Sequence, residues 1–77
     1  MTNAHLEILR HSIGLDERTG RGRAYRNHFV AGGKDEALCR ELVAEGLMIE
    51  GRRSELTGGD PVFFVTKAGR VAAESPS

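Results

Sequence analysis

Cysteine is nearly absent from this chain, and the single residue of that type, Cys39, excludes an internal disulfide. Because Ala37 and Leu38 precede it, we expect Cys39 to be half-buried in a helix, where a free thiol behaves as a small apolar group. No apolar run is long enough to span a bilayer, and the first residues carry neither a basic nor an apolar signal segment. We therefore expect a cytoplasmic protein that does not enter a membrane.

The residue types that build metal and catalytic sites are also sparse. His5 and His11 are six residues apart, not the three or four that share a helix face, and no paired-cysteine spacing exists. No serine lies in a nucleophile-elbow pattern, and no spacing implies an acid–base pair. The sequence thus predicts no catalytic residue, no metal, no cofactor and no small-molecule substrate, and we expect a protein that is not an enzyme.

A net charge of one sign is the next absence, since the formal total is zero. The zero total hides an uneven distribution. Five cationic side chains and no acid lie between Arg18 and Lys34, whereas seven acids oppose three arginines between Asp35 and Asp60. We expect an arginine- and glycine-rich arm over residues 18–33, mobile unless contacts order it, and an acidic helix after it.

The chain is long enough for one domain, residues 1–77, with a modest core. Hydrophobic spacing and cap residues predict helices over 3–13, 35–45 and 67–74, strands over 47–50 and 61–65, and a frayed tail over 75–77. The expected core consists of Leu6, Leu9, Ile13, Leu38, Leu42, Leu47, Ile49, Phe63, Val65 and Val71. Since folding a chain this short leaves little net stability, a dimer or a partner would help.

The stretch from Ala24 to Val30 has two interpretations. One helical turn would place Tyr25 and Phe29 on the same side, whereas a strand would place Tyr25, Asn27 and Phe29 on one face. We favour a short helical turn, or an irregular anchor packed by Tyr25 and Phe29. Either form can cover an outward apolar strip of Met48, Val62 and Phe64 on the hairpin.

Two segments carry a resemblance to a known fold. The run Leu42-Val43-Ala44-Glu45-Gly46-Leu47-Met48 resembles the end of a winged-helix recognition helix entering the wing. The run Val65-Thr66-Lys67-Ala68-Gly69-Arg70 resembles the return strand and final helix start of bacterial winged-helix regulators. The resemblance covers about half of the chain and implies an α+β fold: a reduced winged helix with a two-stranded antiparallel hairpin before the last helix. The stretch from Tyr25 to Val30 is also similar to segments of small uncharacterised prophage-encoded proteins.

The winged-helix resemblance implies DNA binding and transcription regulation. The acidic helix would repel phosphates, so we expect the contacts to come from the arm and the wing. Arginine forks suit phosphate geometry, and the candidate nucleic-acid contacts are Arg18, Arg21, Arg23, Arg26, Arg52 and Arg53. Tyr25, His28 and Phe29 would add base stacking on a single strand.

An alternative needs no nucleic acid. The arm arginines can instead pair with the acids at positions 35, 36, 41 and 45, in the same or a neighbouring molecule. The protein would then be a protein-interaction module whose acidic helix faces a basic partner or a second copy of the chain.

Overall fold

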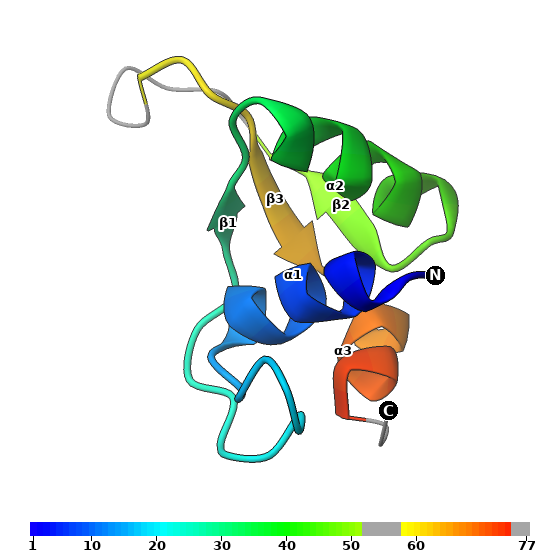
Figure 1. Ribbon diagram of the computed structural model, residues 1–77. Helices are drawn as coiled ribbons and strands as arrows, with labels where there is room; N and C mark the ends of the chain where they lie inside the picture. The colour runs from blue at the N-terminus through cyan, green and yellow to red at the C-terminus, as the bar shows by residue number, and fades with distance from the viewer. Residues whose placement is uncertain (52–57, 75–77) are drawn as a thin grey trace.

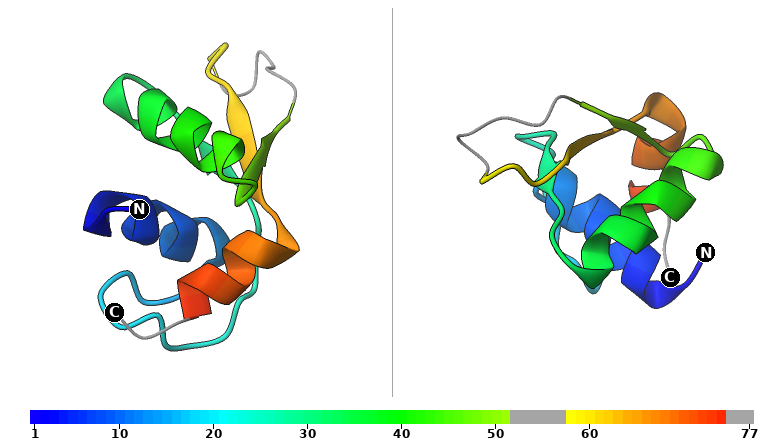
Figure 2. Two further views of the ribbon diagram at one scale, coloured as in Figure 1. Left: turned by 90° about the vertical axis from the view of Figure 1, so that its right-hand side faces the viewer. Right: turned by 90° about the horizontal axis from the view of Figure 1, so that it is seen from above.

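The computed structural model describes residues 1–51 and 58–74 as an α+β domain (Figure 1). Its elements are α1 (Asn3–Ile13), β1 (Phe29–Val30), α2 (Lys34–Ala44), β2 (Met48–Glu50), β3 (Val62–Val65) and α3 (Lys67–Glu74). The helices α1 and α2 lie on the same side of the sheet, and α3 follows β3 and packs against α1 (Figure 2). The expected class, with three helices and a hairpin before the last, is confirmed. None of the helices within the described residues is both long and apolar enough to cross a bilayer.

Local signals set the ends of α1. The helix covers the expected residues, but its cap is Thr2 and not Asn3. The Thr2 hydroxyl accepts a hydrogen bond from the His5 backbone, and the Thr2 backbone N–H donates to Nδ1 of His5, which makes a reciprocal capping box. At the other end Gly14 takes a left-handed conformation with φ +89°, as expected of a glycine at this position.

The end of α2 is the Schellman stop that the sequence predicts. The backbone N–H of Leu47 donates to the carbonyl of Leu42 at 2.9 Å, and that of Gly46 donates to the carbonyl of Val43 at 2.9 Å. Gly46 has φ +77°, which a residue with a Cβ rarely adopts. The chain is thereby reversed directly into β2.

The sheet has a third strand that replaces the expected helical turn. β1 pairs antiparallel with β3, with Phe29 opposite Phe63 and Val30 opposite Val62, so the strand order is β1-β3-β2. The expected helical turn is not formed, because backbone pairing with β3 outweighs the local four-residue spacing. Residues 24–28 are irregular, the other form considered, but the segment ends in a strand at Phe29–Val30. Tyr25 is 70% exposed and lies before the strand begins.

The two faces of β2 are the reverse of those expected. Met48 is buried and Ile49 is 56% exposed. The register explains this, since Met48 lies directly opposite Val65, and residues opposite each other in a ladder point to the same face. Val65 and Phe63 face inward as expected, while Val62 and Phe64 are half-buried. The predicted outward strip therefore loses Met48 to the core.

The core lies between the two stacked helices and the sheet. Leu9, Ile13, Leu42, Phe63 and Val65 are buried as expected, with Leu38 and Leu47 packed at the edge. Val71 was wrongly placed in the core and is 63% exposed. The helix α3 instead buries Gly69 and Ala73, and a Cβ at Gly69 would collide with the carbonyl of Leu47. Small residues let α3 approach the start of β2 closely.

Candidate functional site

The expected arm is an ordered loop within the described residues. The carboxylate of Asp16 accepts hydrogen bonds from the backbone N–H groups of Arg18 and Thr19, both at 2.9 Å, and from the Thr19 hydroxyl at 3.2 Å. These donors lower the pKa of Asp16, the Thr19 backbone N–H most and that of Arg18 next. The N–H of Asp16 donates to the carbonyl of Arg21, and that of Gly20 to the carbonyl of Asp16. Contacts therefore order residues 16–21.

A buried arginine, Arg10, which has no counterpart among the predicted site residues, forms hydrogen bonds to the backbone of this loop from the protein interior. Arg10 is 1% exposed, and its Nε donates to the carbonyl of Ala73 at 2.9 Å. Its Nη1 donates to the carbonyls of Glu17, at 3.2 Å, and of Arg18, at 3.0 Å. Arg10 thus joins α1, the loop and the C-terminal end of α3. The helix dipole of α3 also favours a cation at that end.

The structure places Arg18 and Arg26, two of the predicted contact residues, in different hollows. Arg18 lines a small hollow with Glu7 and Glu17, and the side chains of Arg21 and Arg23 are exposed. Arg26 lies in a different cleft, described below. Arg52 and Arg53, like the expected tail at 75–77, fall outside the described residues.

Residues 15–25 and residues 58–61 of the hairpin lie at opposite ends of the molecule. Figure 1 shows residues 15–25, in cyan, at the lower end, and the segment that leads into β3, in yellow, at the upper end. Figure 2 shows the same separation from a second direction. Residues 15–25 therefore do not approach residues 58–61 of the hairpin, and cationic neighbours that could extend the loop into a basic face lie elsewhere.

Those neighbours come from the start of α3. A cleft of about 510 Å³, here called the basic cleft, opens between residues 24–27 and the first turn of α3. Its lining includes the apolar residues Ile13, Ala24 and Val65 and the polar residues Tyr25, Arg26, Asn27, Thr66, Lys67 and Arg70. No aspartate or glutamate is among its described lining residues, although Nε of Arg70 pairs with Oε1 of Glu74 at 3.2 Å. The three cations Arg26, Lys67 and Arg70 against this one nearby carboxylate favour an anion in the cleft.

Arg26 is held within the basic cleft. Its Nε and Nη2 donate to the carbonyl of His11, at 3.1 and 2.7 Å, near the end of α1. These bonds use two of the five N–H donors of a guanidinium. The same group lies over the Tyr25 ring, 5.3 Å from its centroid. Arg26 therefore has a structural role and still presents positive charge to the cleft.

Lys67 and Arg70, which line the basic cleft, were not among the residues predicted from the sequence. Their spacing of three places both on one face of a helix that Thr66 caps, and this was visible in the sequence. The Thr66 hydroxyl accepts from the N–H of Gly69 and donates to the carbonyl of Gly46, which fixes the start of α3. Only the tertiary structure shows that this face lies beside Arg26.

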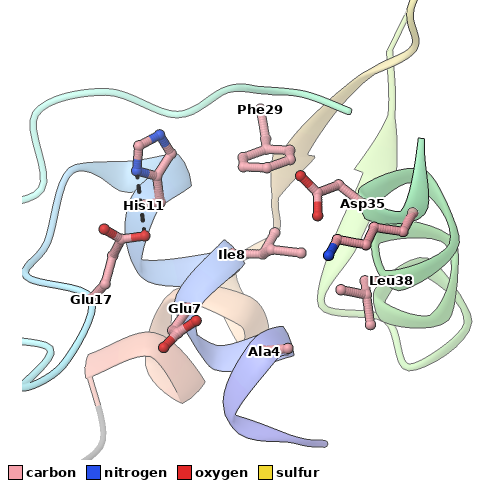
Figure 3. A pocket seen from close by; sticks show the side chains of 9 residues that line it. Ala4, Glu7, Ile8, His11, Glu17, Phe29, Asp35 and Leu38 are labelled. Atoms are coloured by element: carbon pink, nitrogen blue, oxygen red, sulfur yellow. Dashed lines mark ion pairs between the residues drawn. The ribbon is translucent and has the colours of Figure 1, made fainter. Parts of the chain in front are cut away.

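A second hollow lies on another part of the surface. A groove of about 580 Å³, here called the acidic groove, runs between α1, β1 and α2 (Figure 3). Figure 3 shows Ile8, Phe29 and Leu38 pointing toward one another, with one carboxylate near Ile8 and Phe29 and two others farther along the groove, one of them beside His11. Those carboxylates belong to Glu7, Glu17 and Asp35, and His11 and Lys34 also line the groove.

The acids of α2 have partners other than the arm. Arg40 donates to Glu36 at 3.0 Å and makes two bonds to Glu50, at 3.0 and 3.2 Å. The Glu50 carboxylate, followed by that of Glu36, raises the pKa of Arg40. Nε2 of His5 lies 2.7 Å from Oε1 of Glu41 and links α1 to α2. Intramolecular pairing of Glu36 and Glu41 therefore does not depend on the arm arginines.

Cys39 is fully buried, more deeply than the half-buried position expected. Burial raises the pKa of its thiol from 9.0 to about 11, and the Asp35 and Glu36 carboxylates add to the effect. Within residues 1–51 and 58–74, no three His, Cys, Asp or Glu side chains are grouped to hold a metal ion. Cys39 is thus a core residue.

Comparison with known proteins does not assign a family. No family model matches the chain, and no significant match is found among curated proteins or solved structures. Its function must therefore be argued from the basic cleft and the acidic groove.

Proposed function

We propose that this domain is a small nucleic-acid-binding accessory protein that recognises the phosphate backbone. The observation that carries the proposal is the basic cleft, where Arg26, Lys67 and Arg70 line one hollow without a carboxylate among the described lining residues. Exposed Arg21 and Arg23 precede it in the chain and would extend the contact along a backbone. Arg18 remains a candidate contact, as do Arg52 and Arg53, which the sequence analysis assigns to the wing.

The finer fold assignment, a reduced winged helix, belongs to this proposal. Its support is the Schellman turn from α2 into β2 and the Thr66 cap that starts α3, which are the two segments of the resemblance. Transcription regulation and a phage origin rest on the resemblance alone. We propose binding without catalysis, since the sequence offers no nucleophile or acid–base pair at catalytic spacing.

Fluorescence anisotropy with a labelled DNA duplex across a salt series tests the proposal. The logarithm of affinity should fall linearly with the logarithm of salt concentration, with a slope near −0.9 for each phosphate contact. The double variant Lys67→Ala, Arg70→Ala should bind more weakly with a shallower slope. The triple variant Arg21→Ala, Arg23→Ala, Arg26→Ala should do the same.

A matched control is Arg40→Ala, since this exposed arginine is also paired with carboxylates, those of Glu36 and Glu50, but lies outside the basic cleft. Its slope should equal that of the unmodified protein. Equal affinity of the Lys67, Arg70 double variant and the unmodified protein would remove the basic cleft as the contact.

The acidic groove favours a second candidate function, a protein-interaction module without nucleic-acid binding. Its apolar residues Ile8, Phe29 and Leu38 line the same groove as three carboxylates, of which that of Asp35 is near Ile8 and Phe29 (Figure 3). This combination suits the stem and charged head of an arginine or lysine. An NMR titration with an arginine-rich peptide tests this candidate. Chemical-shift changes at Ile8, Phe29 and Leu38 should vanish in the double variant Glu7→Gln, Asp35→Asn and persist in the control Glu45→Gln. This result would support the protein-interaction function.

A further inference from the structure

The exposed ring of Tyr25 is held in place by the residues around it. Tyr25 is 70% exposed, yet its backbone N–H donates to the carbonyl of Ile13 at 3.0 Å. One edge of the ring lies against Gly14, so that a Cβ at Gly14 would collide with it. An exposed aromatic ring usually pays an entropy cost when it is ordered on binding, and here much of that ordering is already present.

The surroundings of this ring suit a nucleobase and its phosphates. The Arg26 guanidinium covers part of the ring, and the ring borders the basic cleft with its apolar residues Ile13 and Val65. The cleft volume of about 510 Å³ falls within the range of small-ligand sites. Lys67 and Arg70 line the same cleft, where they can reach phosphates on either side of a bound base.

We propose that the basic cleft takes single-stranded nucleic acid, with one base stacked on Tyr25 and its flanking phosphates bound by Arg26, Lys67 and Arg70. The inference rests on the proposed function and narrows its ligand. Bases within a duplex are stacked on each other and cannot present a face to Tyr25, whereas unpaired bases can.

This contact is tolerant of sequence. Asn27 is the amide side chain that lines the cleft, and its Nδ2 donates to the carbonyl of Val65 at 3.0 Å while its Oδ1 accepts from the Val65 N–H at 2.7 Å. Both ends of the amide are therefore engaged in the sheet. Stacking on Tyr25 accepts any base, because every base has a π face.

Tyr25 provides its own spectroscopic probe. It is the single tyrosine of a chain without tryptophan, so the tyrosine emission of the protein reports on this residue alone. Titration with oligo(dT) of about ten nucleotides, a length typical of such sites, should quench that emission as the base stacks on the ring. The complementary duplex of the same length should leave the emission nearly unchanged.

Anisotropy with the same labelled oligonucleotides measures the affinities. We expect the single strand to bind at least about tenfold more tightly than the duplex, and Tyr25→Ala to weaken single-strand binding by about tenfold. Tyr25→Phe should bind the single strand nearly as well as the unmodified protein. Ile49→Ala, which removes an exposed apolar side chain of β2 outside the cleft, is the control.

The outcomes separate the two proposals. If both oligonucleotides bind with a salt-dependent affinity but Tyr25→Ala leaves single-strand binding unchanged, base stacking is overturned and phosphate binding stands. A duplex affinity equal to that of the single strand would also overturn base stacking and leave phosphate binding in place. If neither oligonucleotide binds in a salt-dependent way, both proposals are overturned. A circular dichroism spectrum of Tyr25→Ala that matches the unmodified protein ensures that a loss of affinity reflects the missing ring.

Discussion

Arg10 illustrates how one side chain can join three segments of a small domain. Its guanidinium lies beneath the loop at 16–21 and donates to the carbonyls of Glu17, Arg18 and Ala73. The Arg10 residue is 1% exposed, so these carbonyl oxygens take the place of water as partners of its guanidinium. Removing the guanidinium would leave the carbonyl of the buried residue Ala73 and those of Glu17 and Arg18 without these donors, which costs more than losing an exposed ion pair.

Arg10→Met should therefore lower the free energy of unfolding by about 3 kcal/mol, since the methionine retains much of the volume but none of the donors. Urea denaturation followed by circular dichroism measures this loss. Arg23→Met is the matched control, because Arg23 is exposed and its substitution should cost less than about 0.5 kcal/mol. Equal midpoints for the two variants would contradict the role assigned to Arg10.

Cys39 gives a pH-dependent prediction. Its thiol has a pKa of about 11 in the folded chain against an ordinary 9.0, so folding favours the neutral form. The resulting stabilisation is fully present below pH 9 and is lost as the pH rises from 9 through 11, by up to about 3 kcal/mol. Urea denaturation at pH 8 and pH 11 should show a larger loss for the unmodified protein than for Cys39→Ala. Equal losses would show that the thiol does not contribute.

At the scale of elements, β1 is a two-residue strand that a side chain lengthens. The amide of Asn27 makes two hydrogen bonds to the backbone of Val65, in place of a further pair of strand residues. This explains how a short strand can be stable at the edge of β3. It also explains why the segment is not the expected helical turn, because a turn would forfeit these long-range bonds.

Asn27→Ala should lower the free energy of unfolding by about 2 kcal/mol, since both Val65 groups lose a partner. The amide of Val65 should exchange with solvent faster, as measured by hydrogen–deuterium exchange in NMR. His28→Ala is the control, because the His28 side chain is exposed and its backbone bond to Ser12 is retained. Unchanged protection of Val65 in Asn27→Ala would contradict the proposed extension of the strand.

At the scale of the whole molecule, opposite charges are separated while the total is zero. The loop at 16–26, at one end of the molecule (Figure 1), carries the exposed residues Arg18, Arg21 and Arg23. The helix α2 carries Asp35, Glu36 and Glu41, of which Asp35 lines the acidic groove (Figure 3). A neutral protein has little net repulsion between copies, so its oppositely charged surfaces can meet.

We expect weak self-association at low ionic strength and a monomer at about 0.5 M salt, where the Debye length is only a few ångströms. Sedimentation velocity at several protein concentrations should show a weight-average coefficient that rises with concentration only in low salt. Glu41→Gln, Glu45→Gln should reduce the effect. A coefficient independent of both salt and concentration would argue against a homodimer built on these charges.

Parts of the candidate site were predictable from the sequence. Arg26 was expected as a contact, and it lies in the basic cleft. Lys67 and Arg70 could have been recognised from the sequence as a cationic face of the last helix. Their proximity to Arg26, which lies 41 residues before Lys67, could not. The burial of Arg10 had no sequence signal, since a lone arginine within an amphipathic helix is normally solvated.

What the sequence determined by itself is the set of local events. Gly14 and Gly46 end their helices because the left-handed conformation is open to glycine, and Thr66 starts α3 because its hydroxyl accepts the N–H of Gly69. The tertiary structure alone decided the strand at Phe29–Val30, the inward face of β2 and the neighbours of each charged side chain. These depend on register and packing between distant segments, whose energies exceed the small local preferences on which a sequence pattern rests.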